Sequence, residues 1–340
     1  MKLQASDLDY RLIYDHYIAG RRSAVLTVAL KLEIFTVLER SPLSITELSE
    51  KCDLSLRGCT GIVRSLMAMQ LLNELDNLLY NTPESSAFLI KGKEGYIGAL
   101  MEMEWDNFLS PKNLLAAAKE DRPTVYGQED VWENHSMDLE NSQKFTAAMH
   151  SISTQPALAL ANLPIWQQGR GTLPTTILDM GCGSAVYSIA LLQKHPQLTA
   201  VAADLPAMRP IIESYLKQYD VQDRAYFLGI DMFRESWPQA SAIILSQILH
   251  DWNPTQCRLL LTQAFDALES NGLLVIHEKL TANHTHLPLA NALVNLDMLI
   301  WTEGQQFAPA ELEKLLIDVG FQNITFTHTA PYWSAIIAQK

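Results

Sequence analysis

Residues 176–192 constrain the fold of this chain more than any other stretch, because they predict a buried strand, a glycine turn and a helix in direct succession. The strand ends at Asp179, whose carboxylate is expected to point into the crevice beyond it. Gly181 and Gly183 lack a Cβ, so the turn can bend sharply and approach a ligand closely. The free N–H groups at the start of the helix favour an anion. This order is typical of the first unit of a doubly wound sheet, where ligands bind beyond the strand ends.

The next predicted strands also end in polar residues. They cover residues 198–203, 225–230 and 242–249, and the residues at their tips are Asp204, Asp231 and the pair His250-Asp251. Because parallel strands end at the same edge of a sheet, these side chains are expected to converge on one crevice. A carboxylate at the position of Asp204 is placed to accept the hydroxyls of a ribose. Met232 and Phe233 offer apolar side chains that can flank a base.

A nicotinamide dinucleotide is the first alternative ligand for such a crevice. Its fingerprint requires a third glycine after Gly181 and Gly183, and Val186 occupies that position. The end of the chain predicts two further strands, at residues 324–328 and 333–338, that form a hairpin. A terminal hairpin added to a parallel sheet argues against a plain dinucleotide domain.

The composition limits the class of protein. The chain has 340 residues, 48% of them apolar, which is enough for two domains with well-packed cores. Its 25 Lys and Arg against 38 Asp and Glu give a formal net charge of −13, which disfavours nucleic acid and anionic membranes as partners. The sequence shows neither a signal peptide nor an apolar stretch of membrane-spanning length. We therefore expect a cytoplasmic protein.

The sequence does not indicate a metal site. The four cysteines form no C-x-x-C pair, so neither a zinc site nor a disulfide framework is expected. Two histidines, His284 and His286, lie in a predicted loop without a nearby cluster of carboxylates or cysteines. We expect these two side chains to be solvated.

The first hundred residues predict a compact helical module. A helix is expected over residues 10–39, a capping box at residues 44–47 opens a short helix, and a third helix covers residues 56–72. Two short apolar runs around residues 76–77 then predict a hairpin. Helices followed by a hairpin in this order are typical of a winged helix.

A winged helix raises the question of DNA binding. The predicted recognition helix carries only Arg57 and Arg64 as cations and is otherwise mostly apolar. Groove binding requires a basic face for the phosphates and side chains that reach the base edges. We therefore expect the module to bury its apolar surface against a second copy of itself, with a DNA-binding regulator that senses the ligand of the crevice as the alternative.

Residues 101–165 predict helices rich in Met and aromatic side chains, which are typical of a core but also candidates for the lining of an acceptor cavity. We divide the chain into a winged-helix dimerisation domain at residues 1–100, a helical linker at residues 101–165 and a ligand-binding domain at residues 166–340. Our candidates for the acceptor cavity, including some from the last domain, are Met101, Trp105, Phe108, Phe145, Met149, Asn295, Met298 and Trp301.

Over almost its whole length, the chain resembles the S-adenosylmethionine-dependent O-methyltransferases of the plant phenol and bacterial polyketide type. The motifs that carry the resemblance are residues 179–185, Asp204-Leu-Pro206, Asp231-Met-Phe233, Leu249-His-Asp-Trp252 and the strand at residues 273–278. The Leu-His-Asp-Trp run is specific, whereas a glycine loop alone is not. The resemblance implies a homodimer with a class I methyltransferase fold: an α/β, doubly wound, mostly parallel sheet with a C-terminal antiparallel hairpin, preceded by the winged-helix domain.

The resemblance also implies roles for the site residues. His250 would be the general base, Glu278 would orient its ring, and Asp251 lies beside it. The implied contacts to S-adenosylmethionine, and to its product S-adenosylhomocysteine, come from Asp179, Gly181, Gly183, Asp204, Leu205, Asp231, Met232 and Ser246. The implied acceptor is a hydroxyl of a small aromatic or polyketide-like metabolite. Its pocket would include Trp105, Phe108, Phe145, Met149, Asn295, Met298 and Gln306.

Two positions depart from the family pattern. The third small position of the glycine loop is Ala185 rather than Gly, and Gln306 stands where plant members carry a second carboxylate beside the histidine. A glutamine can position a ring by hydrogen bonding but adds no negative charge. A weaker base or a more acidic acceptor hydroxyl is compatible with that change.

The chemistry of the reaction requires alignment and a base. A sulfonium methyl group is already activated, so the protein must align donor and acceptor and exclude water. A phenol has a pKa of about 10, and a histidine with an ordinary pKa of about 6.5 can accept its proton, which is typically worth about 10²–10⁴-fold in rate. The alternatives on the same scaffold are N- or C-methylation, or a reaction without methyl transfer.

Overall fold

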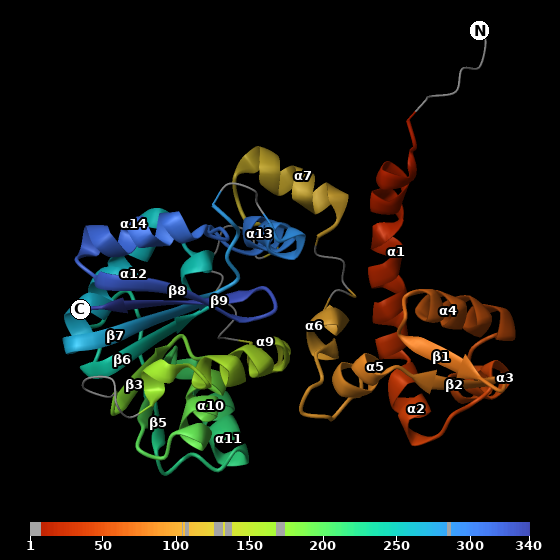
Figure 1. Cartoon of the computed structure of the whole chain (residues 1–340), viewed down its shortest axis with the longest axis horizontal. Helices are drawn as coiled ribbons and strands as arrows, with labels where there is room; N and C mark the ends of the chain where they lie inside the picture. The colour runs from red at the N-terminus through yellow and green to blue at the C-terminus, as the bar shows by residue number, and fades with distance from the viewer. Residues whose placement is uncertain are drawn as a thin grey trace, which may run out of the picture. The chain divides into compact units, whose positions relative to one another are not determined.

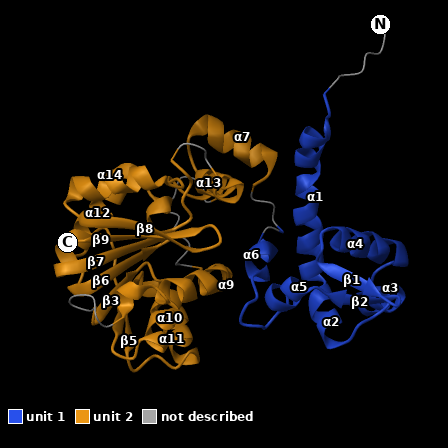
Figure 2. Ribbon diagram, in the orientation of Figure 1, with its two compact units in different colours: residues 1–106 blue, residues 107–340 orange. Residues whose placement is uncertain are grey.

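The computed structural model describes residues 8–103, 105, 109–125, 132, 138–167, 174–283 and 287–340. The chain forms two compact units, residues 1–106 and residues 107–340 (Figure 2). Unit 1 packs helices around a two-stranded hairpin, and unit 2 is a layered α/β unit (Figure 1). Among the described residues, no helix is both long and apolar enough to cross a membrane.

Unit 1 has the predicted order of helices and hairpin. Its elements are α1 (Arg11–Lys31), α2 (Ile34–Arg40), α3 (Ile45–Lys51), α4 (Leu56–Ala68), β1 (Leu72–Leu75), β2 (Leu78–Asn81), α5 (Pro83–Phe88) and α6 (Gly98–Met103). The predicted capping box is confirmed, because the backbone N–H of Glu47 donates to Ser44 Oγ and the backbone N–H of Ser44 donates to the Glu47 carboxylate. At the hairpin turn, Asp76 and Asn77 both have positive φ, as a tight two-residue turn requires.

The prediction of one continuous helix over residues 10–39 is wrong. Helix α1 ends at Lys31, Glu33 adopts a left-handed conformation with φ of 54°, and α2 starts at Ile34. The break directs Ile34 and Phe35 into the core of unit 1, where both are fully buried. Burial of two large apolar side chains outweighs a left-handed residue that costs about 1–2 kcal/mol.

Unit 2 contains a seven-stranded sheet in the order β5-β4-β3-β6-β7-β9-β8. Its strands are β3 (Thr176–Met180), β4 (Thr199–Asp204), β5 (Ala225–Gly229), β6 (Ala240–Ser246), β7 (Leu268–Glu278), β8 (Gln322–Ala330) and β9 (Trp333–Gln339). The first five strands of that order are parallel, and β9 pairs antiparallel with both β7 and β8. The predicted doubly wound sheet with a terminal hairpin is thereby confirmed.

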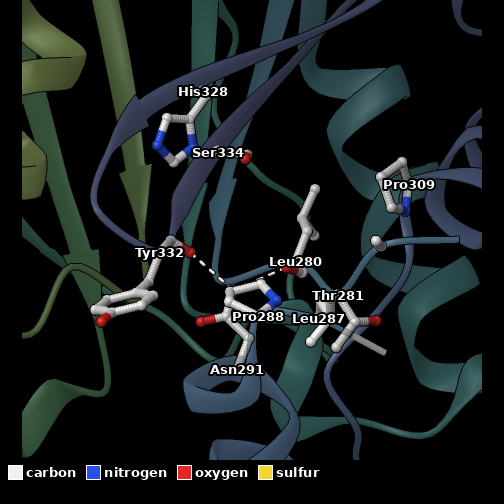
Figure 3. Close-up of a pocket in the computed structure, with 10 residues that line it drawn as sticks. Leu280, Thr281, Leu287, Pro288, Asn291, Pro309, His328, Tyr332 and Ser334 are labelled. Atoms are coloured by element: carbon white, nitrogen blue, oxygen red, sulfur yellow. Dashed lines mark hydrogen bonds between the residues drawn. The ribbon is translucent and has the colours of Figure 1, made fainter. Parts of the chain in front are cut away.

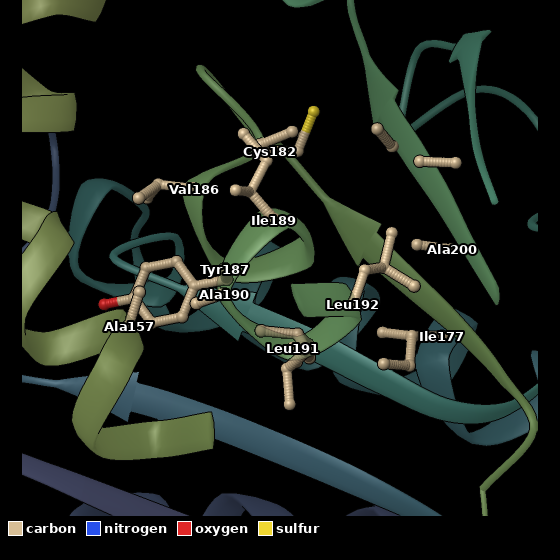
Figure 4. Packing of buried hydrophobic residues seen from close by; sticks show 14 of the residues in the cluster. Ala157, Ile177, Cys182, Val186, Tyr187, Ile189, Ala190, Leu191, Leu192 and Ala200 are labelled. Atoms are coloured by element: carbon tan, nitrogen blue, oxygen red, sulfur yellow. The ribbon is translucent and has the colours of Figure 1, made fainter. Parts of the chain in front are cut away.

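Helices cover both faces of this sheet (Figure 1). The helices of unit 2 are α7 (Pro111–Glu120), α9 (Leu139–Ala161), α10 (Val186–Lys194), α11 (Arg209–Gln218), α12 (Pro254–Ala267), α13 (Leu289–Trp301) and α14 (Pro309–Val319), with short 3-10 helices η2 (Pro164–Trp166), η3 (Pro206–Met208) and η4 (Leu249–Asp251). One apolar core lies between the sheet and α9, α10 and α11, and part of it is drawn in Figure 4. A second core lies between the sheet and α12 and α14. Two buried faces explain why the central strands are apolar throughout.

The fourth parallel strand is shorter than predicted. We expected a strand over residues 242–249, but β6 ends at Ser246. Gln247 then adopts φ of 53°, and the chain turns into η4, which carries His250. The apolar residues Ile248 and Leu249 therefore belong to a turn that packs on the second core rather than to the strand.

Candidate active site

The glycine loop between β3 and α10 is anchored to the end of β4. The backbone N–H groups of Gly181 and Cys182 both donate to the carbonyl oxygen of Ala203, at 2.8 and 3.1 Å. Gly181 has φ of 65°, and a Cβ there would lie 2.4 Å from Ile248 Cδ1. Gly183 has φ of 56°, and a Cβ there would meet no protein atom within 4 Å. The loop therefore needs glycine for its conformation, and at Gly183 it borders open space.

Asp204, at the tip of β4, faces the same loop. Its two carboxylate oxygens accept hydrogen bonds from the backbone N–H groups of Gly183 and Leu205, each at 2.8 Å. Burial raises the pKa of this carboxyl group. Each oxygen of a carboxylate can accept more than one hydrogen bond, so Asp204 retains capacity for ribose hydroxyls. Leu205 is half-buried beside it.

Asp179 is turned towards helix α10. Its Oδ2 accepts hydrogen bonds from the backbone N–H of Ser188 at 3.2 Å and from the Ser188 hydroxyl at 2.7 Å. Burial raises its pKa to about 6. These contacts fix the end of β3 to the first turn of α10, and a direct contact of Asp179 with the cofactor stays a prediction.

The remaining predicted cofactor residues lie at the tips of β5 and β6. Asp231 Oδ1 accepts hydrogen bonds from the backbone N–H groups of Phe233 and Arg234, at 2.9 and 3.3 Å, and thereby shapes its own turn. Met232 is half-buried against the second core. At the end of β6, the Ser246 hydroxyl donates to the carbonyl oxygen of His277 at 3.4 Å.

His250 lies in η4, where three polar side chains surround its imidazole. Its Nδ1 is 3.3 Å from Glu278 Oε2 and 2.9 Å from the amide Nε2 of Gln306. Its Nε2 is 3.6 Å from Asp251 Oδ1, which is beyond hydrogen-bond distance. Glu278 and Gln306 therefore hold the ring at Nδ1, while Nε2 makes no hydrogen bond to a described side chain.

Two buried oxygens near the ring favour the tautomer of His250 in which Nδ1 carries the proton, and in this tautomer Nε2 can act as a base. Glu278 Oε2 and Gln306 Oε1 both lack a hydrogen-bond partner within the described ranges. A half-turn of the Gln306 amide exchanges its nitrogen and oxygen, so both oxygens can face Nδ1 of His250. A proton on Nδ1 then satisfies them and leaves the lone pair of Nε2 free to accept a proton.

Burial controls the charge of this cluster. It lowers the pKa of His250 to about 3, with a further lowering from the charge of Lys279, so the ring is neutral at pH 7. Burial and the nearby Asp251 raise the pKa of Glu278 to about 8, while its oxygen Oε1 accepts the backbone N–H of Ile248 at 3.1 Å. Burial also raises the pKa of Asp251 well above its ordinary value. A neutral imidazole next to an ionisable carboxyl is suited to accept a proton from an acceptor hydroxyl.

The loop after α13 packs directly on this cluster. A Cβ at Gly304 would lie 1.9 Å from the carbonyl oxygen of His250, so only glycine fits there. Asn295 Oδ1 accepts the backbone N–H of Gln306 at 2.7 Å and fixes the loop from α13. Sequence reasoning missed the role of Gly304, which only the packing of two distant loops reveals.

Helix α9 contacts two of the loops that form the crevice. His150 lies 2.8 Å from the hydroxyl of Ser184 in the glycine loop and 2.9 Å from the hydroxyl of Tyr219. Ser153, one turn further, accepts a hydrogen bond from the amide of Gln247 at 3.0 Å. These contacts were not predicted, because His and Ser on an apolar helix give no signal of what they face.

The predicted acceptor-pocket residues are distributed over both units. Met298 is buried and Asn295, Phe145, Met149 and Trp301 are half-buried, all of them in unit 2. Met101 packs on the core of unit 1, as an ordinary core residue does. Trp105 also belongs to unit 1, where Lys31 Nζ lies 5.7 Å from its ring. Phe108 lies outside the described residues.

A cavity of about 410 Å³ lies beyond the end of β7 (Figure 3). Asn291 lines it, and its amide Nδ2 donates to the carbonyl oxygens of Leu280 and Tyr332, at 2.8 and 2.9 Å. Its lining consists of Leu280, Thr281, Ala282, Leu287, Pro288, Asn291, Pro309, His328, Tyr332 and Ser334. It contains none of the predicted acceptor residues and does not include His250.

The sheet order, the glycine loop and the terminal hairpin define a class I methyltransferase fold. Among the described residues, no group of three or more His, Cys, Asp or Glu is placed to bind a metal. A family model of the O-methyltransferase domain matches residues 112–322, and a model of the O-methyltransferase dimerisation domain matches residues 15–91. The chain belongs to the S-adenosylmethionine-dependent O-methyltransferase family.

Known relatives agree with this assignment, and a solved structure shares the fold. The chain is 28% identical to the tetracenomycin polyketide synthesis 8-O-methyl transferase TcmO of Streptomyces glaucescens, over 90% of this chain and 89% of that protein. It is 26% identical to the 3-hydroxy-5-methyl-1-naphthoate 3-O-methyltransferase of Streptomyces sahachiroi, over 93% and 91% of the two chains. The crystal structure of human N-acetylserotonin methyltransferase in complex with SAM superposes with a TM-score of 0.86, at 22% identity and 99% coverage of both chains.

Proposed function

We propose that the protein transfers the methyl group of S-adenosylmethionine to a hydroxyl of a small aromatic or polyketide-like metabolite, with His250 as the general base. The observation that carries this proposal is the imidazole held at Nδ1 by Glu278 and Gln306, with Nε2 unoccupied by any described side chain. The relatives named above act, by their names, on a polyketide and on a hydroxynaphthoate.

The residues at the strand tips fit the cofactor. Gly183 borders open space, and Asp204 presents a half-buried carboxylate that retains capacity for ribose hydroxyls. Leu205 and Met232, both half-buried, would flank the adenine, and the glycine loop would face the amino-acid end. The bound cofactor supplies an activated methyl group. The protein aligns the acceptor, and Nε2 of His250 accepts the proton of the acceptor hydroxyl.

Two further parts of the proposal concern the assembly. The match to a dimerisation domain supports a homodimer formed through the first hundred residues. The hydrogen bonds from α9 to the crevice loops support a role of the segment at residues 101–165 in the acceptor pocket. Both parts are consistent with the predicted division of the chain.

Methyl transfer to a panel of phenols, catechols and hydroxylated polyketides tests the proposal. We expect product 14 mass units heavier, by mass spectrometry, with the methyl group on oxygen, and a rate about 10²–10⁴-fold lower for His250→Ala. Asp266→Ala, which changes an exposed carboxylate of α12, is the matched control and should keep the wild-type rate. Methylation of nitrogen or carbon that persists in His250→Ala would instead favour the alternative reactions, because alignment alone can drive them.

A further inference from the structure

Lys279 follows the tip of β7 and is half-buried without a hydrogen-bond or ion-pair partner among the residues that the structure describes. Its Nζ lies 5.2 Å from the centre of the Trp333 ring. An ammonium group carries three N–H donors, and because this side chain is only half-buried, a ligand can reach them. The protein therefore presents a partly exposed cation whose N–H groups are available to water or to a bound anion.

The neighbouring carboxyl groups do not form an ion pair that would neutralise the positive charge of Lys279. Burial lowers its pKa, while Asp297 on α13 and the adjacent Glu278 raise it from a distance. Neither carboxylate lies within ion-pair distance, and the raised pKa of Glu278, about 8, keeps that group mostly protonated at pH 7. The charge of Lys279 in turn lowers the pKa of His250, so the ammonium lies within electrostatic reach of the reacting site.

Its position favours the acceptor over the cofactor. The glycine loop, which is proposed to hold the amino-acid end of the cofactor, follows β3, and β7 lies two places away in the sheet order β3-β6-β7. Lys279 instead follows Glu278, whose carboxyl group faces His250 at 3.3 Å. The flat ring of Trp333 beside the ammonium suits an aromatic ligand.

We propose that Lys279 binds a carboxylate of the acceptor, which makes the acceptor a hydroxylated aromatic acid. This inference rests on the proposed function, because it takes the space next to His250 to be the acceptor site. Gln306 agrees with it, since an amide in place of a second carboxylate avoids repulsion of an anionic acceptor.

Equilibrium binding to the protein loaded with S-adenosylhomocysteine tests the inference. The probes are hydroxybenzoic and hydroxynaphthoic acids, each paired with its methyl ester, and the readout is calorimetry. We expect at least one acid to bind about 10-fold or more tightly than its ester, a preference that Lys279→Met abolishes and Lys279→Arg retains. Lys217→Met, on the exposed side of α11, changes the net charge equally and should leave the preference intact.

Three outcomes would overturn the inference: no acid preferred in the wild type, the preference retained in Lys279→Met, or weaker binding of S-adenosylhomocysteine itself in that variant. The last outcome would assign Lys279 to the carboxylate of the cofactor. Methyl transfer is scored separately on the same acids. A preference that depends on Lys279 without transfer to the hydroxyl would contradict the proposed function alone.

Discussion

His250 and Glu278 share their protons, and this sharing determines when the pair can act as a base. The imidazole can accept a proton at Nε2 only when Nδ1 donates to an ionised Glu278. Because the pKa of Glu278 is raised to about 8, the carboxyl group holds its proton at lower pH and blocks that state. The site is therefore poised to gain activity as the pH rises.

We expect kcat for a weakly acidic phenol to rise with pH up to about 8 and then to level off. In Glu278→Gln the side chain cannot ionise, so kcat should be lower and this limb of the profile should disappear. The measurement is kcat from pH 6 to 9 at saturating cofactor and acceptor for both proteins. The same rising limb in both would show that Glu278 does not control the base.

A substitution at Gly304 tests how strictly the contact between its loop and η4 sets the position of His250. Gly304→Ala places a Cβ in contact with the carbonyl oxygen of His250 and must displace η4. We expect kcat to fall by about 10- to 100-fold while the Kd of S-adenosylhomocysteine is unchanged, because the glycine loop lies elsewhere. Gly20→Ala in α1, where a Cβ meets no atom within 4 Å, is the control and should leave kcat unaltered. Equal effects of the two substitutions would contradict this role.

At the scale of elements, α9 holds the crevice loops in place through side chains rather than through backbone pairing. His150 connects the glycine loop to Tyr219, and Ser153 connects α9 to the turn before His250. Burial lowers the pKa of His150 to about 4, so the ring is neutral at pH 7 and can donate at one nitrogen and accept at the other. A helix from outside the central sheet thereby positions two loops that follow different strands.

A double-mutant cycle on His150 and Ser184 tests that role. Each of His150→Ala and Ser184→Ala should weaken the binding of S-adenosylhomocysteine by about 5-fold, and the double variant should be no worse than either. Lys144→Ala, on the exposed side of α9, is the control and should bind as the wild type does. Additive losses in the double variant would show that the two residues act independently.

At the scale of the whole molecule, local signals in the sequence predicted the fold well. The glycine turn, the capping box at Ser44 and the hairpin at Asp76 each require particular residue types at fixed spacing, and each is present in the structure. The breaks at Glu33 and Gln247 were not predicted, because ordinary residues adopt left-handed conformations there under the demands of packing. No local pattern marks such positions.

The active site shows the same difference between features that local signals predict and features that depend on long-range packing. The strand-tip residues were predicted from the order of strands, and the proximity of His250, Glu278 and Gln306 from the family resemblance. Gly304, His150 and Lys279 were missed, because their roles depend on contacts between segments far apart in the chain. The acceptor pocket was the least predictable part, since apolar helices look alike whether they line a cavity or a core.

The dependence of the His250 effect on the acidity of the acceptor tests the central claim most directly. The measurement is the rate of methyl transfer at pH 7 for wild type and His250→Gln with two acceptors of similar shape, one an ordinary phenol with a pKa of about 10 and one already ionised at that pH. If His250 is the base, the substitution lowers the rate for the ordinary phenol by about 10²-fold or more and has little effect on the ionised one. An equal loss for both acceptors, or no loss for either, would contradict that assignment.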